Sequence, residues 1–438
     1  MNTYFNEEMK QLLGTEYEDF QNTQNNAMYK AIRINTQRSD LKELEQYFNL
    51  GKQSRFDKDT YLIDNDDKLG NHPFHLGGLF YIQEPSATTA VNALQIEEGD
   101  KVLDLCAAPG GKSTQILTRL NGTGFLVTNE ISRSRANTLL SNIERWGNDN
   151  YLLTSMDSAE ICTRFREYFD KILVDAPCSG ASMFKKYPDT INDYNENSVK
   201  ACALRQAMIL DNAAVALKEG GYLVYSTCTY NQIENESVVY EFLKRHEEFE
   251  LVDTGLNELR RGIPYLDLDV SKVTRIFPMD EGEGHFVARL HKKGSSKGYD
   301  YKLLSYSKDK LVDVFIKENC LNEFNYTIIK DSIYQTSNNM LDFKGMILRQ
   351  GILVGNIVKN RIEPHQHFFT AIKNENNFRN VYDITDDREL ASFLKGESLN
   401  VPGYKGYVQI KYHNHPIGYG KADNRIIKNK LPKGLRQN

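Results

Sequence analysis

Residues 102–114 read VLDLCAAPGGKST, and this stretch decides the fold of the 438-residue chain. A short apolar run ends in a loop of small residues, proline and two glycines, and a helix is expected to start at Ser113. A buried strand that delivers such a loop to a helix is typical of a nucleotide-type binding site. Glycines let the backbone approach a ligand, and the first helical turn offers free N–H groups to polar or anionic atoms.

The chemistry of the loop favours one ligand over two others. Its tail, Gly111-Lys112-Ser113, matches the end of a phosphate-binding P-loop, but the first glycine of that motif would fall at Cys106. The glycine spacing of a dinucleotide-binding loop is also missing. Residues 106–112 fit better a Rossmann-like methyltransferase, whose ligand S-adenosylmethionine carries a carboxylate and no pyrophosphate.

The residues around the loop alternate between strand and helix patterns from about 95 to 292. Expected strands are 101–106, 124–129, 151–154, 171–174 and 221–226, with a late strand at 284–290, and expected helices are 113–120, 133–145, 201–217 and 234–246. The strands are nearly continuous apolar runs, as a sheet covered on both faces requires. The pattern predicts a parallel, doubly wound α/β sheet.

The chain is too long for one compact core, so several domains are expected. We divide it into a small N-terminal α+β domain (1–75), a Rossmann-like catalytic domain (76–293), a Gly/Ser-containing linker (294–300) and a C-terminal α+β extension (301–438). No apolar run approaches the roughly 20 residues of a membrane span, and residues 1–10 do not resemble a secretory signal. A cytoplasmic protein is expected.

Charge is unevenly distributed along the chain. The net charge of −5 argues weakly against a polyanionic partner, yet residues 405–438 carry eight Lys and Arg against one acid. This basic end is compatible with nucleic-acid binding and equally with a solvated tail.

Acidic residues follow three successive predicted strands. Glu130 lies about 20 residues past Gly110, where an acid can pair with ribose hydroxyls. Asp157 follows the third strand, where a carboxylate can accept from an adenine amino group, and Asp175 ends the fourth. Each acid alone could be a solvated residue or a helix cap, but their joint occurrence favours a binding site at the carboxyl edge of the sheet.

Two of the six cysteines also lie at strand ends. None of the six belongs to a C-x-x-C pair, so no metal site is expected. Cys178 follows the fourth predicted strand and Cys228 the fifth, in turns that would expose them to the ligand. For Cys162, Cys202 and Cys320, inert packing is the expected role, and Cys106 is expected to be structural.

A thiol beside a methyl donor has a specific chemical use. Oxygen and nitrogen acceptors already have lone pairs, whereas pyrimidine C5 has none. A thiolate that adds to C6 makes C5 nucleophilic, and the adduct must then lose the C5 proton and expel the thiol. One cysteine can be the nucleophile and the other can assist release. A carboxyl group beside the base could donate to N3.

With these motifs, the chain resembles the cytosine-C5 RNA methyltransferase family of the NOL1/NOP2/Sun type. The resemblance rests on residues 104–112, 175–180 and 226–229, with softer matches at 81–86, 142–147 and 275–278. It implies that Cys228 is the nucleophile, that Cys178 helps release product, and that Asp175 and Lys112 reach the base. It also implies a cofactor site for S-adenosylmethionine made of Ala107, Ala108, Pro109, Gly110, Gly111, Lys112, Glu130, Asp157 and Asp175, with Arg135 as a weaker candidate.

The same resemblance implies an RNA partner. Residues 282–288 and a PUA-like ending at 418–425 are most similar to bacterial members that act on 16S ribosomal RNA, so that RNA or the small subunit is the expected partner. The N-terminal domain and the extension would then bind RNA, and Phe184 and Tyr187 could stack bases. A monomer is expected. Transfer RNA, a different methyl acceptor and a non-catalytic assembly factor remain as alternatives.

Overall fold

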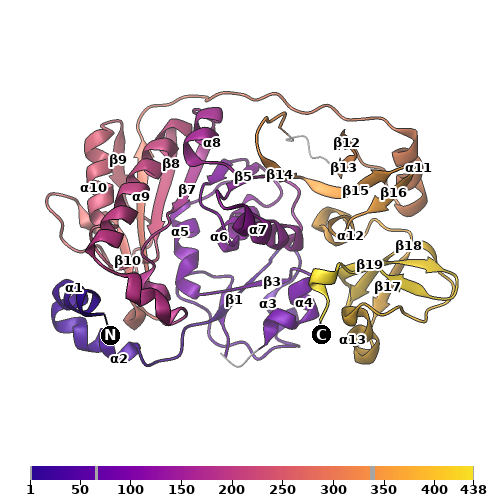
Figure 1. The fold of residues 1–438 in the computed structure, drawn as a ribbon, viewed down its shortest axis with the longest axis horizontal. Helices are drawn as coiled ribbons and strands as arrows, with labels where there is room; N and C mark the ends of the chain where they lie inside the picture. Colours follow the sequence, from indigo (N-terminus) through magenta and orange to yellow (C-terminus); the bar gives the residue numbers. More distant parts are fainter. Residues whose placement is uncertain (1, 65–67, 336–340, 438) are drawn as a thin grey trace.

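The computed structural model describes residues 2–64, 68–335 and 341–437. Its central sheet has the strand order β10-β11-β8-β7-β4-β5-β6-β14, with β9 also paired to β11 (Figure 1). The strands are β4 (Lys101–Asp104), β5 (Phe125–Asn129), β6 (Tyr151–Thr154), β7 (Phe169–Asp175), β8 (Leu217–Thr227), β9 (Phe249–Val252), β10 (Thr274–Ile276), β11 (His285–Lys292) and β14 (Ile347–Gln350). Strands β4 to β8 are parallel, so the predicted doubly wound α/β sheet is confirmed.

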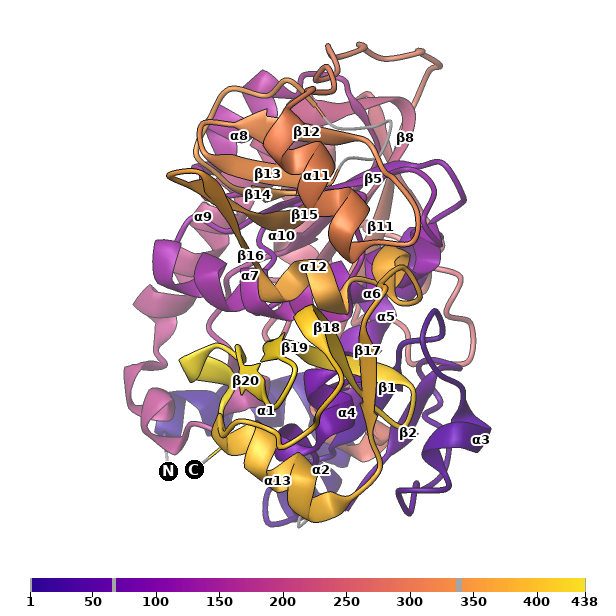
Figure 2. The ribbon, with the colours of Figure 1, turned by 90° about the vertical axis from the view of Figure 1, so that its right-hand side faces the viewer.

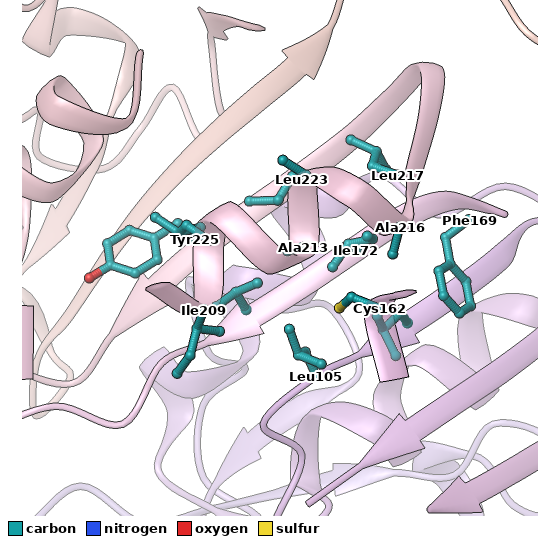
Figure 3. Packing of buried hydrophobic residues seen from close by; sticks show 14 of the residues in the cluster. Leu105, Cys162, Phe169, Ile172, Ile209, Ala213, Ala216, Leu217, Leu223 and Tyr225 are labelled. Atoms are coloured by element: carbon teal, nitrogen blue, oxygen red, sulfur yellow. The ribbon is translucent and has the colours of Figure 1, made fainter. Parts of the chain in front are cut away.

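Helices cover both faces of this sheet. Successive residues of a strand point to opposite faces, and in the central strands both sets are apolar, so each face needs a covering layer. Leu103 and Val127 belong to one apolar cluster, and their neighbours Val102 and Leu126 belong to another. The first cluster is completed by α8 (Ser158–Arg164), α9 (Glu196–Ala216) and α10 (Glu236–Arg245), and Figure 3 shows part of it. The second is completed by α5 (Thr89–Leu94), α6 (Gly111–Leu120) and α7 (Arg133–Trp146).

Several helices begin at residues other than those predicted, because capping residues that the apolar pattern does not reveal set the first helical turn. Helix α6 begins at Gly111 instead of Ser113, with Gly110 at its N-cap. Helix α9 begins at Glu196, five residues before the predicted start, because the Asn195 side chain accepts from the backbone N–H of Ser198 in a capping box. The predicted elements also did not include the short helix α8, which Asp157 caps.

The topological switch point lies between β4 and β7. From β4 the chain runs outward through β5 and β6, and it then returns to the other side of β4 to form β7 and β8. Loops at the carboxyl ends of the two strands that flank a switch point line a crevice. The loop of residues 105–110 and the turn of residues 176–180 therefore lie side by side.

The N-terminal residues contribute to two separate cores. Strands β1 (Ala31–Ile34), β2 (Thr60–Leu62) and β3 (Phe80–Gln83) form a small sheet, with α3 (Leu41–Leu44) and α4 (Pro73–Leu76) beside it. Helices α1 (Thr3–Leu13) and α2 (Tyr17–Thr23) instead pack on the domain of the central sheet, where Phe5 meets Phe184 and Tyr194.

The C-terminal extension forms two four-stranded sheets. One contains β12 (Tyr326–Ile329), β13 (Ser332–Gln335), β15 (Ile352–Val358) and β16 (Arg361–Pro364), with α11 (Lys310–Asn319) and α12 (Gln366–Thr370). The other contains β17 (Val381–Ile384), β18 (Lys405–Tyr412), β19 (His415–Asp423) and β20 (Ile427–Asn429), with α13 (Asp387–Lys395). This last sheet shares one apolar core with the sheet of β1, β2 and β3, so these two sheets pack together (Figure 2).

The extension is also built into the central sheet. Strand β14 pairs antiparallel with β6 and completes the edge of the sheet. The segment that enters β14 carries Phe343, whose ring stacks on Phe165 with the centroids 4.7 Å apart. The segment after β11 follows the same surface, where Tyr301 packs on Tyr168 with centroids 4.7 Å apart. Among the described residues, no helix is both long and apolar enough to cross a membrane.

Phe343→Ala is expected to lower the free energy of unfolding by about 1–3 kcal/mol, because it removes a half-buried aromatic contact between the extension and the catalytic domain. Urea unfolding followed by circular dichroism would measure the change. Leu321→Ala is the matched control, since Leu321 is 55% exposed and its loss should change stability by less than about 0.5 kcal/mol. Equal effects of the two variants would contradict this docking contact.

Candidate active site

The loop of residues 105–110 is held by hydrogen bonds from neighbouring elements. Ala107 N–H donates to the carbonyl oxygen of Asn129 at 2.9 Å, and Asn142 Nδ2 donates to that of Pro109 at 2.7 Å. Arg135 donates to the carbonyl oxygen of Ala108 at 3.0 Å and lies 3.5 Å from Glu130. Arg135 therefore orients the loop from α7, a contact that sequence spacing did not predict.

A cavity of about 1200 Å³ opens at the switch point. Most of the residues predicted from the sequence line it: Ala107, Ala108, Pro109, Gly111, Lys112, Glu130, Asp157, Asp175, Cys178 and Cys228. Gly110 does not, because its α-carbon faces α7, where an added Cβ would lie 3.0 Å from Leu139 Cδ1. With φ at +115°, Gly110 serves the turn of the loop and not the cavity wall.

Three of the acids that line the cavity lie in different environments. Glu130 is buried, and its Oε1 accepts from the backbone N–H of Ser132 at 2.9 Å. Asp157 is exposed and caps α8 by accepting from Ala159 N–H at 2.8 Å. Asp104, which sequence analysis did not select, is fully buried, and burial raises its pKa to about 7. Its Oδ1 has no hydrogen-bond partner among the described residues.

Lys112 and Asp175 form an ion pair in the wall of the cavity. Lys112 Nζ donates to Asp175 Oδ2 at 2.8 Å, and Ser226 Oγ donates to Oδ1 at 2.8 Å. Burial alone would raise the pKa of Asp175, but the Lys112 ammonium brings it below its ordinary value. The carboxyl group is therefore ionised in the free protein, and hydrogen donation from a carboxyl group to N3 stays a prediction about the adduct.

The two strand-end thiols are in contact. Cys178 Sγ and Cys228 Sγ lie 3.2 Å apart, although 50 residues separate them in the sequence. The hydrogen bond from Cys178 lowers the pKa of Cys228, whereas the same bond and then burial raise the pKa of Cys178. Of the two thiols, Cys228 is therefore the one that ionises more easily. Burial raises the pKa of the Cys106 thiol, as expected for a structural cysteine.

A buried carboxylate that sequence analysis missed fixes the turn around Cys178. Glu234 is fully buried and accepts from the backbone N–H of Ser179 at 2.9 Å and from its hydroxyl. Gln206 and Asn231 donate to the same carboxylate at 2.8 and 2.7 Å. The only signal in the sequence is that Asn231 and Glu234 follow Cys228 within six residues, in the same polar turn.

The loop after Cys178 has one aromatic side chain that is buried and one that is exposed. Phe184 is 8% exposed and packs on Phe5 with the ring centroids 5.3 Å apart, so the prediction that it stacks a base was wrong. Burial against an N-terminal helix could not be read from local sequence. Tyr187 is 52% exposed, and Lys186 lines the cavity, so these two side chains remain available to a ligand.

Fold and cavity together define a Rossmann-like methyltransferase. Family models match three segments: "16S rRNA methyltransferase RsmB/F" over residues 91–291, "N-terminal domain of 16S rRNA methyltransferase RsmF" over 1–85, and "Methyltransferase RsmF PUA domain" over 379–437. The chain belongs to the RsmF family of 16S rRNA methyltransferases.

Similar proteins match nearly the whole chain. Ribosomal RNA small subunit methyltransferase F of Vibrio vulnificus (strain YJ016) is 33% identical over 385 residues, which cover 84% of this chain and 81% of the relative. That of Vibrio cholerae (strain M66-2) is 30% identical over 450 residues, covering 96% and 94%. A methyltransferase homolog from Pyrococcus horikoshii has a similar structure, with a TM-score of 0.56 at 28% identity over 66% of this chain and 94% of that one.

Proposed function

We propose that this protein methylates C5 of a cytosine in 16S ribosomal RNA, with S-adenosylmethionine as the methyl donor and Cys228 as a covalent nucleophile. The observation that carries this proposal is the contact between the Cys178 and Cys228 sulfur atoms in the wall of the cavity. Transfer to oxygen or nitrogen needs no thiol, whereas transfer to a pyrimidine carbon does. The descriptions of the matching family models name 16S rRNA, and the names of the relatives specify small-subunit ribosomal RNA, which supports the choice of 16S ribosomal RNA.

The polar groups of the cavity fit S-adenosylmethionine. The orphaned Oδ1 of Asp104 and the carboxylates of Glu130 and Asp157 are acceptors, and the donor groups of this molecule are an ammonium, ribose hydroxyls and an adenine amino group. The loop of residues 107–112 offers backbone N–H groups to its carboxylate. When bound, it supplies an electrophilic methyl group on a sulfonium ion.

Cys228 starts the reaction in this proposal. Its thiolate forms a bond to C6, and the electron pair of the C5–C6 double bond makes C5 nucleophilic toward the methyl group. Negative charge also spreads toward N3 and O2 of the base. The Lys112 ammonium, paired with Asp175 at 2.8 Å, is the buried cation that stabilises this charge.

Cys178 ends the reaction. While Cys228 is a thiolate, it keeps the proton on Cys178. Once Cys228 is bonded to C6, its charge is gone, the pKa of Cys178 falls, and Cys178 releases its proton to solvent. Its thiolate then takes the C5 proton, the C5–C6 double bond re-forms, and Cys228 leaves as the thiolate. The net proton lost from C5 is thereby accounted for.

Incubation with labelled S-adenosylmethionine is expected to place label at C5 of cytosine in 16S ribosomal RNA, located by mapping the modified base. Free RNA and assembled small subunits should be tested in parallel, together with transfer RNA, because C5 and C6 must be unpaired or flipped out for reaction. Label on a protein or on a base nitrogen would contradict the proposal. Binding without any label would favour a non-catalytic assembly factor.

A further inference from the structure

His285 begins β11 and lies in the cavity wall beside the reactive groups. Phe286 pairs with Thr227 of β8, so His285 lies next to Cys228, the residue that follows Thr227. Its side chain is 5% exposed, it lines the cavity, and its Nε2 is 3.9 Å from Asp175 Oδ1. No step of the proposed reaction uses this imidazole.

A single hydrogen bond of the His285 ring indicates which nitrogen carries the proton. Nδ1 lies 2.9 Å from the carbonyl oxygen of Gly284, which can only accept, so Nδ1 carries the hydrogen. Burial and then the Lys112 ammonium lower the pKa of His285 to about 4, so the ring is neutral at neutral pH. Nε2 therefore presents a lone pair, and it has no hydrogen-bond partner among the described residues.

The backbone before His285 keeps this lone pair in place. Gly284 has φ at +132°, and a Cβ there would lie 2.3 Å from Tyr230 Cε1. Tyr230 donates its hydroxyl hydrogen to the carbonyl oxygen of Glu283, whose N–H donates to Glu84 at 2.9 Å. Buried acceptors are normally paired, so an acceptor held this firmly without a partner implies one that arrives with the substrate.

We propose that His285 recognises the 4-amino group of the target cytosine, with Nε2 accepting one of its hydrogens while Asp175 accepts the other. This inference rests on the proposed function. The pairing edge of cytosine carries one donor group, the 4-amino group, since N3 and O2 are acceptors. Thiolate addition to C6 is equally possible for uracil, whose O4 would turn lone pairs toward Nε2. His285 thus supplies the discrimination that the thiol chemistry lacks.

The test compares two RNAs that carry, at the mapped position, either cytidine or the pyrimidin-2-one nucleoside, which lacks only the 4-amino group. Methylation rates at limiting RNA are measured for wild type, His285→Phe and His285→Gln. The cytidine preference of His285→Phe is expected to fall by about ten- to a hundredfold relative to wild type, because the acceptor is lost. His285→Gln should keep much of the preference, since its amide oxygen can reach the position of Nε2.

His291→Phe is the matched control on the same strand, because His291 pairs with Glu250 at 2.8 Å outside the cavity. It should leave the preference unchanged. Equal loss of rate on both RNAs in His285→Phe would overturn the role of His285 and indicate structural damage. A raised KM for S-adenosylmethionine with an unchanged preference would overturn it as well. If wild type formed no 5-methylcytosine in any RNA, the proposed function itself would fail, and this role with it.

Discussion

Cys228→Ala is expected to lower the rate of RNA methylation by about four orders of magnitude or more, while the protein still folds. Among the described residues of the cavity, only Cys228 receives a hydrogen bond from a second thiol, and this bond lowers its pKa and so favours the nucleophilic thiolate. Without it, C5 has no route to nucleophilic character. Single-turnover incorporation of labelled methyl groups into 16S ribosomal RNA would measure the loss.

Cys202→Ala is the matched control for this substitution. Cys202 is a half-buried cysteine of α9 that does not line the cavity, so its loss should leave the rate unchanged. Normal turnover by Cys228→Ala would exclude the thiol mechanism and indicate an oxygen or nitrogen acceptor.

Cys178→Ala is expected to accumulate a covalent protein–RNA adduct that survives denaturing electrophoresis. Addition at C6 and methyl transfer can still proceed, but the group 3.2 Å from the Cys228 sulfur that removes the C5 proton is gone. The adduct should require Cys228, so the Cys178→Ala, Cys228→Ala double variant is the control that must show none. An adduct formed equally by the double variant would contradict the assignment of the nucleophile.

The same variant should also change the pH dependence of adduct formation. The thiolate is the reactive form, so the rate rises with pH and levels off above the pKa of Cys228. In wild type the Cys178 hydrogen bond holds that pKa below its ordinary value. Loss of the donor raises the pKa of Cys228, so the inflection should move to higher pH. Movement to lower pH, or none, would show that the contact does not prepare the nucleophile.

Local sequence was sufficient for the parallel strands β4 to β8 and for most of the residues named as site candidates, but not for β9, β10 and β14. The apolar runs and the motif at residues 104–112 predict a parallel, doubly wound sheet, and the strand order itself comes from the structure. Strand ends then bring Asp175, Cys178 and Cys228 to one edge. The sequence pattern could not predict the protonation state of Asp175, because its lowered pKa depends on Lys112, 63 residues earlier in the chain.

The missed features all depend on contacts between distant segments. Local sequence predicts that Phe184 is available to RNA, but Phe5 of α1 covers it. Glu234 looked like an ordinary acid at a helix start, yet it fixes the turn after Cys178. His285 became a candidate only when the register of β11 placed it beside Cys228. Periodicity reports which face of an element is buried, but not which element buries it.

The pairing of β14 with β6 also has a consequence for biosynthesis. Strand β6 ends at Thr154 and β14 begins at Ile347, so nearly two hundred residues must leave the ribosome before this edge of the sheet is closed. During that interval the nascent catalytic domain presents an unpaired strand to its surroundings. The C-terminal extension is therefore also a folding element, and a prematurely terminated chain would be released with an open, aggregation-prone edge.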